Sequence, residues 1–272
     1  MAIRTIATQD PWLEPYREQL LAQQSYYRSK EKRLLDQTAL EEFALGHLYF
    51  GLHKTAKGWI FREWAPGATD IYLLCENNGW QDTDEYRLVA GKYGVWELLL
   101  PPAALRHGDH YKLGVHWPGG NGERLPSYAT YVTQDTVTHL FDAVVWQPNK
   151  PYIWQHKTPP QPEVPLIYEA HVGMSSEAPH VASYHYFTDD VLPRIKQLGY
   201  TTVQLMAIQE HPYYGSFGYH VSNFFAASSR FGTPDDLKRL IDTAHGMGLH
   251  VIMDVVHSHA VKNELEGLSR FD

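Results

Sequence analysis

Three short apolar runs in the second half of the chain constrain its fold more than any other feature. They read LIYEAHVG from residue 166, TTVQLMAI from residue 201 and LHVIMDVV from residue 249, and helical patterns lie between them. Strands that are apolar throughout are typical of parallel sheets, because the connecting helices cover the sheet faces. A strand–helix–strand order in such a sheet gives right-handed βαβ units. The sequence therefore predicts a parallel sheet with helical crossovers over residues 166–272.

Both helical patterns have candidate starting points. The second begins at Thr233, whose hydroxyl can cap the helix, with Pro234 in the first turn. Asp235 and Asp236 follow, where the positive end of the helix dipole favours acidic side chains. The first pattern has Thr188 as its candidate N-cap. These signals predict one helix between each pair of apolar strands.

Residues 47–146 follow a different pattern. Short aromatic and β-branched stretches recur there, and Gly, Pro, Asn and Asp cluster between them at regular intervals. In the stretch DHYKLGVHW, which starts at Asp109, apolar and polar positions alternate as they do in a half-buried strand. Several such strands separated by turn signals predict an antiparallel β-sandwich.

Two further segments complete the predicted domain organisation. Residues 1–46 are expected to be a helical segment, because Asp10 and Pro11 resemble a cap and a first-turn proline, and apolar side chains then recur near helical spacing. Residues 147–165 contain six prolines, which favour extended backbone. This proline-rich stretch predicts a linker between the sandwich and the parallel sheet.

The composition excludes several classes of protein. The 272 residues carry a formal net charge of −8, so we expect neither nucleic acid nor a membrane as a partner. The chain has no apolar run long enough to cross a bilayer and no signal-peptide pattern at its start. Its single cysteine, Cys75, cannot form a disulfide within the chain. A cytoplasmic protein is therefore expected.

The densest polar cluster follows the third apolar run and consists of Asp254, His257, Ser258 and His259. It lies where a parallel strand ends, and that edge of α/β sheets and barrels usually carries the functional site. Two interpretations are open: these side chains suit a metal-dependent hydrolase, or Asp254 and His259 hydrogen-bond a polar substrate. We favour substrate contact for Asp254 and His259, and a structural role as a buried histidine for His257.

Aromatic side chains beside hydrogen-bonding groups suggest a carbohydrate ligand, because sugar C–H faces pack on rings and sugar hydroxyls need polar partners. The loop over residues 209–233 is rich in such aromatics. In the predicted sandwich, Trp80 ends the turn NNGW, and Lys112 lies on the strand face opposite Tyr111. The alternative for the rings is plain packing, and the alternative for Lys112 is a solvated lysine.

These stretches together resemble the 1,4-α-glucan (glycogen) branching enzymes of the α-amylase superfamily, most closely their eukaryotic-type branch. The likeness extends from about Asp10 to the end of the chain. It is carried by the motifs FREWAPGA (61–68), NNGW (77–80), YGVWELLLPP (93–102), IYEAHVGMSSE (167–177), VLPRIKQLGY (191–200), QLMAIQEHPYYGSFGYHVSNFFAASSRFGTPDDL (204–237) and DVVHSHAVKNELEGL (254–268).

The resemblance implies a multidomain fold. The helical segment would be followed by a sandwich that is a carbohydrate-binding module, and residues 166–272 would hold the first three βα units of an incomplete (β/α)8 TIM barrel. In the barrel, Asp254 and His259 would hold the sugar of the cleavage subsite, and Tyr219 would form its stacking platform. Branching enzymes need no metal or other cofactor, so the resemblance disfavours the metal interpretation.

The resemblance also implies glucan contacts on the sandwich. They fall on Trp80 and Lys112, with Trp64 near them. The partner implied for both sites is an α-1,4-glucan, either glycogen or an amylose-like chain.

The reaction that the resemblance implies is retaining and uses an aspartate nucleophile and a glutamate acid/base. In the family these follow the fourth and fifth barrel strands, whereas this sequence stops just past the third. We therefore assign no catalytic residue to it and do not promote Asp254 to that role. The full-length protein would cleave α-1,4 links and transfer the chain to a 6-hydroxyl, whereas these 272 residues would bind glucan without turnover. The alternatives are a glucan-binding module that acts without catalysis, and a metal hydrolase that uses His257 and His259.

Overall fold

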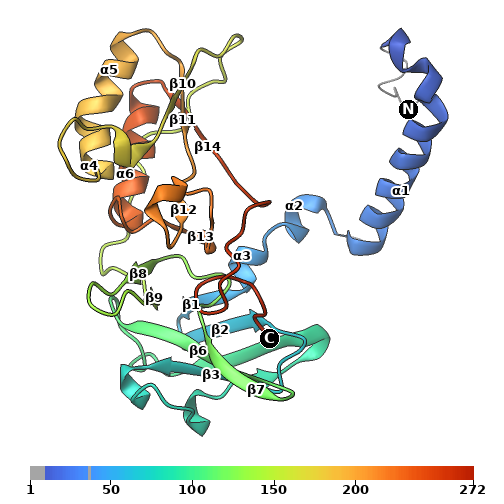
Figure 1. Cartoon of the computed structure of the whole chain (residues 1–272), viewed down its shortest axis with the longest axis vertical. Coiled ribbons are helices and arrows are strands. Elements are labelled where there is room, and N and C mark those ends of the chain that lie inside the picture. Colours follow the sequence, from blue (N-terminus) through green and yellow to red (C-terminus); the bar gives the residue numbers. More distant parts are fainter. Residues whose placement is uncertain (1–9, 36–37) are drawn as a thin grey trace. The chain divides into compact units, whose positions relative to one another are not determined.

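The computed structural model describes residues 10–35 and 38–272, and the chain divides into two compact units, with the boundary in the sequence between Tyr49 and Phe50. In the first unit, Asp10 caps a short 3₁₀ helix, Pro11–Tyr16, because its Oδ1 accepts a hydrogen bond from the main-chain N–H of Trp12 (2.9 Å). Three α-helices follow: α1 (Arg17–Leu35), α2 (Leu40–Phe43) and α3 (Gly46–Tyr49) (Figure 1). None of these four helices buries a residue.

The second unit begins with two antiparallel β-sheets. The first sheet has the strand order β1-β2-β5-β4, with β1 (Gly51–Thr55), β2 (Gly58–Trp64), β5 (Val95–Leu100) and β4 (Val89–Ala90). The second has the order β3-β6-β9-β8 with β7 paired to β6, and comprises β3 (Asp70–Cys75), β6 (His110–Trp117), β9 (Phe141–Val144), β8 (Val132–Gln134) and β7 (Gly120–Arg124).

Alternation of side chains along the strands builds the core between these sheets. On β6, Tyr111, Leu113 and Val115 are buried, whereas Lys112 and His116 are partly exposed. Successive side chains of a strand point to opposite faces, so one face packs inward and the other meets solvent. The alternation predicted for this strand is confirmed.

A parallel sheet of three strands follows the proline-rich stretch. Its order is β10 (Ile167–Ala170), β11 (Thr202–Leu205) and β14 (His250–Met253). Helices α4 (Tyr184–Tyr186) and α5 (Leu192–Gln197) connect the first two strands, and α6 (Pro234–Gly246) connects the second to the third. The loop after β11 also contains a small antiparallel pair, β12 (Gln209–Glu210) and β13 (Asn223–Ala227).

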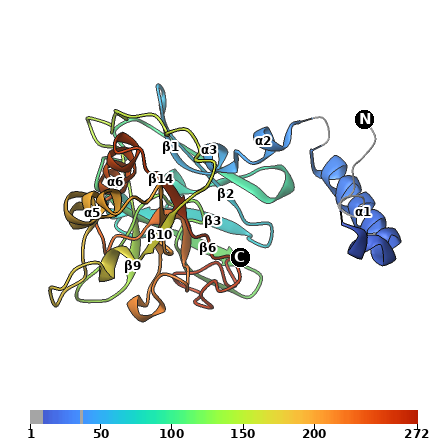
Figure 2. The same ribbon diagram turned by 90° about the horizontal axis from the view of Figure 1, so that it is seen from above.

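The predicted βαβ order is present through the third strand. Residues 254–272, which follow β14, contain no helix. Figures 1 and 2 show α5 and α6 on the same side of the three strands, and their apolar side chains form a core with Val203 and Leu205. On the other side the sheet is open, and Ile167 and Ile252 are 43% and 42% exposed.

The predicted N-cap of α6 is confirmed, and the predicted N-cap of the first helical stretch is wrong. Thr233 caps α6 reciprocally: its Oγ1 accepts from the N–H of Asp236 (3.3 Å), and the Asp236 carboxylate accepts from the N–H of Thr233 (2.8 Å). The N-cap of the first helical stretch is Ser183, whose Oγ accepts from the N–H of Tyr186 (3.1 Å). Thr188 is not a cap, because it lies inside the helical stretch and its buried hydroxyl donates to the carbonyl of Tyr184 (2.6 Å).

The proline-rich stretch, residues 147–165, contains neither helix nor strand, and it is fastened to α6. The carboxylate of Asp242, a residue only 2% exposed, accepts hydrogen bonds from the hydroxyl of Tyr152 (2.8 Å) and from the N–H groups of Gln155 (2.9 Å) and His156 (2.8 Å). The predicted linker is therefore a strap with fixed contacts. In the described ranges, no helix combines the length and apolarity that a bilayer span requires.

Candidate functional site

The carboxyl ends of β11 and β14 place two polar side chains in contact. The main-chain N–H of Asp254 donates to the carbonyl of Leu205 (3.0 Å), which fixes Asp254 at the end of the sheet. Its Oδ1 accepts a hydrogen bond from Nε2 of Gln204 (2.8 Å). The same nitrogen lies 3.5 Å from Oε1 of Glu169 on β10. Gln204 was not singled out from the sequence, although it is the one amide in the apolar run TTVQLMAI.

Tyr219 approaches Asp254 from the loop between β12 and β13. Its hydroxyl donates to Oδ2 of Asp254 (3.2 Å), so both carboxylate oxygens have a donor. Burial and the charge of Asp254 raise the pKa of the Tyr219 hydroxyl above its ordinary value. Gly218 brings the loop in: its φ is +86°, and a Cβ there would lie 2.0 Å from the carbonyl oxygen of Ala207. The structure therefore joins Tyr219 and Asp254 by a hydrogen bond, and their contact with a sugar stays a prediction.

Glu210 lies at the start of this loop, on β12, and is completely buried. Its carboxylate accepts hydrogen bonds from the N–H and the hydroxyl of Ser229 (both 2.7 Å), and from the N–H of His211 (3.0 Å). Burial raises the pKa of Glu210 above its ordinary value, and these hydrogen bonds oppose the rise. A carboxylate with its oxygens occupied by its own loop is suited to holding that loop in place.

Among the described residues, neither His257 nor His259 is hydrogen-bonded to Asp254 or Tyr219. His259 is exposed, and its Nδ1 lies 2.9 Å from the hydroxyl of Ser258. The interpretation of His257 as a buried histidine is wrong, because its side chain is exposed and its ring stacks on Phe224 (centroids 5.6 Å apart, planes at 10°). Among residues 10–35 and 38–272, no group of three or more His, Cys, Asp or Glu side chains is arranged to hold a metal.

A cavity of about 900 Å³ opens beside Asp254, between the sandwich and the parallel sheet. Its wall includes a run of aromatic rings: Tyr128 stacks on Phe225 (4.5 Å) and on Phe50 (5.1 Å). Trp64, at the end of β2, also lines this cavity and is 56% exposed. Lys112 belongs to the second sheet, and neither Trp80 nor Lys112 lines this cavity, so a position of Trp64 near them stays a prediction.

Glu63 lies in the wall of the same cavity and is completely buried. Its two carboxylate oxygens accept hydrogen bonds from the N–H groups of Trp64 (3.0 Å) and Ser127 (2.8 Å). Burial raises the pKa of Glu63 to about 7, although these hydrogen bonds favour the charged form. Glu63 was also not singled out from the sequence.

Trp80 lies on the outer face of the second sheet. Its backbone has φ +61°, which is rare for a bulky side chain, and its N–H donates to the carbonyl of Cys75 (3.0 Å). It borders a cavity of about 380 Å³ together with Gly114, His116 and Glu123. The turn NNGW thus places the Trp80 ring beside an open cavity. Its backbone conformation is unfavourable for a bulky residue, so the surrounding structure must stabilise it.

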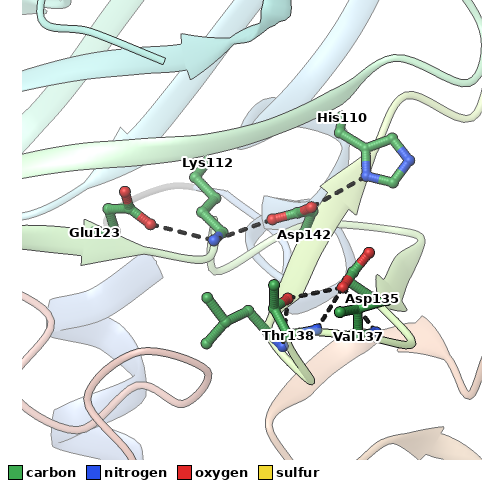
Figure 3. Close-up of polar contacts among 8 residues, drawn as sticks. His110, Lys112, Glu123, Asp135, Val137, Thr138 and Asp142 are labelled. Carbon is green, nitrogen blue, oxygen red and sulfur yellow. Dashed lines mark hydrogen bonds and ion pairs between the residues drawn. The ribbon is translucent and has the colours of Figure 1, made fainter.

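Lys112 lies on the same face, two residues before Gly114 on β6. Figure 3 shows its ammonium between two carboxylates, Glu123 (3.2 Å) and Asp142 (3.0 Å). Partial burial lowers the pKa of Lys112, but the ion pairs outweigh it, and the net pKa lies above the ordinary value. Only 12% of the Lys112 side chain is exposed, so its neighbours cover most of it.

Two family models match the chain. Carbohydrate-binding module 48 (isoamylase N-terminal domain) matches residues 49–129, and the alpha amylase catalytic domain matches residues 189–266. Among solved structures, a pullulanase from Bacillus acidopullulyticus superposes on 78% of this chain and 30% of its own, with a TM-score of 0.63 and 25% identity. A pullulanase from Paenibacillus barengoltzii, solved in complex with maltohexaose and alpha-cyclodextrin, has a TM-score of 0.65 at 23% identity, covering 78% of this chain and 38% of its own.

Curated relatives match nearly the whole chain. A 1,4-alpha-glucan-branching enzyme of Yarrowia lipolytica is 46% identical over 98% of the chain, and one of Dictyostelium discoideum is 45% identical over 97%. One from Solanum tuberosum is 45% identical over 97%. The chain spans 40% of the length of the first two and 32% of the third.

Proposed function

We propose that the chain is an N-terminal part of a 1,4-alpha-glucan-branching enzyme, because relatives of that name are 45–46% identical over 97–98% of it, and that the whole protein cleaves α-1,4 links and transfers the released chain to a 6-hydroxyl. Such a reaction is retaining and proceeds through a covalent glycosyl-enzyme intermediate on a carboxylate. No nucleophile or acid/base is assigned to the residues of this chain. Its own part in the reaction is to bind and orient an α-1,4-glucan, either glycogen or an amylose-like chain, in the cytoplasm.

The observation that carries this proposal is the clamped carboxylate of Asp254. Gln204 and Tyr219 fix its orientation at the open end of the parallel sheet, beside a cavity walled by aromatic rings. A fixed carboxylate can accept hydrogen bonds from neighbouring sugar hydroxyls, and the Tyr219 ring offers a face for the C–H groups. We assign His259, which lies on the exposed segment after β14, as the second hydrogen-bonding group of this subsite.

A second glucan contact is proposed on the sandwich, centred on Trp80. Its ring borders an open cavity, and its unusual backbone conformation is the kind of local strain that collects at binding sites. Lys112 contributes to that face through its ion pair with Glu123, which borders the same cavity. Trp64 belongs to the large cavity beside Asp254, where its exposed ring can support a glucan leaving the barrel subsite.

A binding module without catalysis is the second candidate function, and the Trp80 surface favours it. Incubation of the 272-residue chain with amylose separates the two contributions. We expect retention of the chain in an amylose-containing gel, with no loss of iodine stain and no new α-1,6 ends. New branch points made by this chain alone would contradict the assignment of turnover to residues outside it.

A further inference from the structure

The segment after β14, residues 254–272, begins at the barrel site and ends in the core of the sandwich. Figure 1 shows it leaving β14 and running to the strands of the sandwich. Phe271 is 8% exposed and belongs to the sandwich core. Oδ2 of Asp272 accepts a hydrogen bond from the N–H of Gly67 (2.6 Å). The segment that carries Asp254 and His259 is therefore fastened at both ends.

Arg124 on β7 makes the most specific of the contacts at the sandwich end. Its Nη2 donates to the carbonyl of Arg270 (2.9 Å) and its Nε donates to the carbonyl of Phe271 (3.1 Å). The remaining fork nitrogen, Nη1, donates to the carbonyl of Glu123 (2.8 Å). A guanidinium presents its N–H groups in one rigid plane, so these bonds fix both the position and the direction of the segment.

The surroundings of Arg124 are unusual for a charged side chain. The residue is 3% exposed, and its guanidinium lies 4.8 Å from the centre of the Trp117 ring. Burial lowers its pKa below the ordinary value. Within the part of the chain that the structure describes, it makes no ion pair. The charge of Glu264 opposes this lowering of the pKa without a direct ion pair, so the buried cation depends mainly on main-chain carbonyls, and two of the three it uses belong to the segment.

A second part of the same segment covers Lys112. Leu265 and Glu266 line a small pocket with Lys112 and Phe141. Burial raises the pKa of the Glu266 carboxyl, and the positive charge of Lys112 opposes that rise. The segment therefore contacts the second sheet of the sandwich at two places, Lys112 and Arg124.

Between its ends the segment has few other restraints. Its backbone bonds to the rest of the barrel at the N–H of Asp254 and at the N–H of Val261, which donates to the carbonyl of Val221 (2.9 Å). A loop without helix or strand loses much of its conformational freedom when its far end is fixed. Releasing the Arg124 end would therefore loosen the stretch that contains His259.

We propose that Arg124 is a positioning residue for glucan binding: it holds the segment after β14 on the sandwich and thereby restrains the stretch that carries His259. The sandwich is then a structural part of the barrel subsite as well as a glucan contact of its own. The coupling to sugar rests on the proposed function, whereas the fastening of the segment by Arg124 does not.

The test compares Arg124→Ala and Arg124→Lys with Arg87→Ala in the full 272-residue chain. Arg87 is a matched control, because it is also a sandwich arginine and its ion-pair partner is Asp70, away from the segment. Amide hydrogen exchange is followed in peptides covering 255–269 and, for comparison, α6. For Arg124→Ala we expect exchange about tenfold faster in the segment alone, since the two lost bonds come from a charged donor. Arg124→Lys keeps the charge and one donor group and should fall in between.

Maltohexaose affinity, measured by calorimetry, provides the second readout. We expect Arg124→Ala to bind about three- to tenfold more weakly, and Arg87→Ala to bind like the unchanged chain. Unchanged exchange in the segment, or an increase spread equally over α6, would overturn the proposal, as would faster exchange with unaltered affinity. If Arg124→Ala does not fold, Arg124→Lys decides by the same criteria. Failure of the unchanged chain to bind maltohexaose would contradict the proposed function, and the exchange data would still decide whether Arg124 holds the segment.

Discussion

The hydroxyl of Tyr219 lies 3.2 Å from Oδ2 of Asp254, and this hydrogen bond joins the long loop after β11 to the end of β14. The two residues are 35 positions apart in the sequence, and each comes from a different βα connection. Asp254 is therefore oriented by a residue whose ring is itself proposed to face the sugar.

Tyr219→Phe and Tyr219→Ala separate the two roles of this tyrosine. Phe keeps the ring and removes the hydroxyl, so maltohexaose affinity should fall only about threefold. Ala removes the stacking face as well, and affinity should fall about tenfold or more. Calorimetric titration measures both, with Tyr213→Phe as a control on an exposed tyrosine of the same loop. Equal affinities for the Phe and Ala variants would argue against a stacking platform at this position.

Glu63 predicts a dependence of stability on pH. Its pKa is about 7 in the folded chain and near 4.5 when the side chain is exposed, so the folded state holds the proton more tightly. This contribution to the free energy of unfolding is fully present below about pH 4.5, and it is lost as the pH rises to 7. The shift corresponds to about 3 kcal/mol.

Urea unfolding of the unchanged chain and of Glu63→Gln, at pH 5 and pH 8, tests this dependence. The Gln variant should be less stable at pH 5, because its amide group cannot accept both main-chain hydrogen bonds, but it should lack this loss between the two pH values. Glu97→Gln, which changes a partly exposed glutamate on β5, serves as the control and should retain the loss. Parallel pH profiles for the unchanged chain and Glu63→Gln would refute the assignment.

Trp80 can be tested without confusing its ring with its backbone conformation. Trp80→Gly and Trp80→Ala both remove the ring, but glycine accepts a φ of +61° without strain. We expect both variants to lose retention in an amylose gel, while the Gly variant is at least as stable to urea as the Ala variant. The control is Trp12→Ala. Trp12 lies in the 3₁₀ helix before α1 and is 87% exposed, and we expect this variant to be retained in the gel like the unchanged chain. Normal retention of Trp80→Gly would remove the ring from the binding surface.

The cap of α6 gives a prediction for folding alone. Thr233→Ala removes a hydroxyl that accepts from the Asp236 N–H, and should lower the free energy of unfolding by about 1 kcal/mol. Thr243→Ala, in the body of the same helix, should be neutral or slightly stabilising, since alanine is the better helix former. Urea midpoints measure both. A larger loss for Thr243→Ala would show that packing, and not capping, dominates this helix.

The resemblance implied that Tyr219 and Asp254 share one sugar subsite, and the structure adds Gln204 as a second partner of the Asp254 carboxylate. The ends of parallel strands gather at one edge, so the position of Asp254 after the third apolar run was enough to place it at that edge. Gln204 escaped notice because a single amide in an apolar strand is indistinguishable by pattern from an ordinary polar exception. Its role depends on the register between β11 and β14, where Gln204 pairs with Ile252, and register is not encoded locally.

Glu63 shows a signal that was present and not used. On β2, Trp59 and Phe61 are buried, and Glu63 has the same parity along the strand. Period-two alternation alone places its carboxyl in the core, where an acid is rarely found. The position of Trp64 relative to Trp80 and Lys112 is a different case, because local pattern identifies strands but does not say which of two sheets a strand joins. The structure places Trp64 on a strand of the first sheet and Lys112 on a strand of the second.

Asp242 gives the chain a mechanical property. Three donors from the proline-rich strap converge on this one carboxylate of α6, so the connection between sandwich and barrel has no slack at that point. A force that pulls the sandwich away from the barrel would load these bonds, and through them α6, before it could stretch the strap. The joint is therefore rigid, and the distance between the two proposed glucan contacts is set by the fold instead of by the reach of a flexible tether.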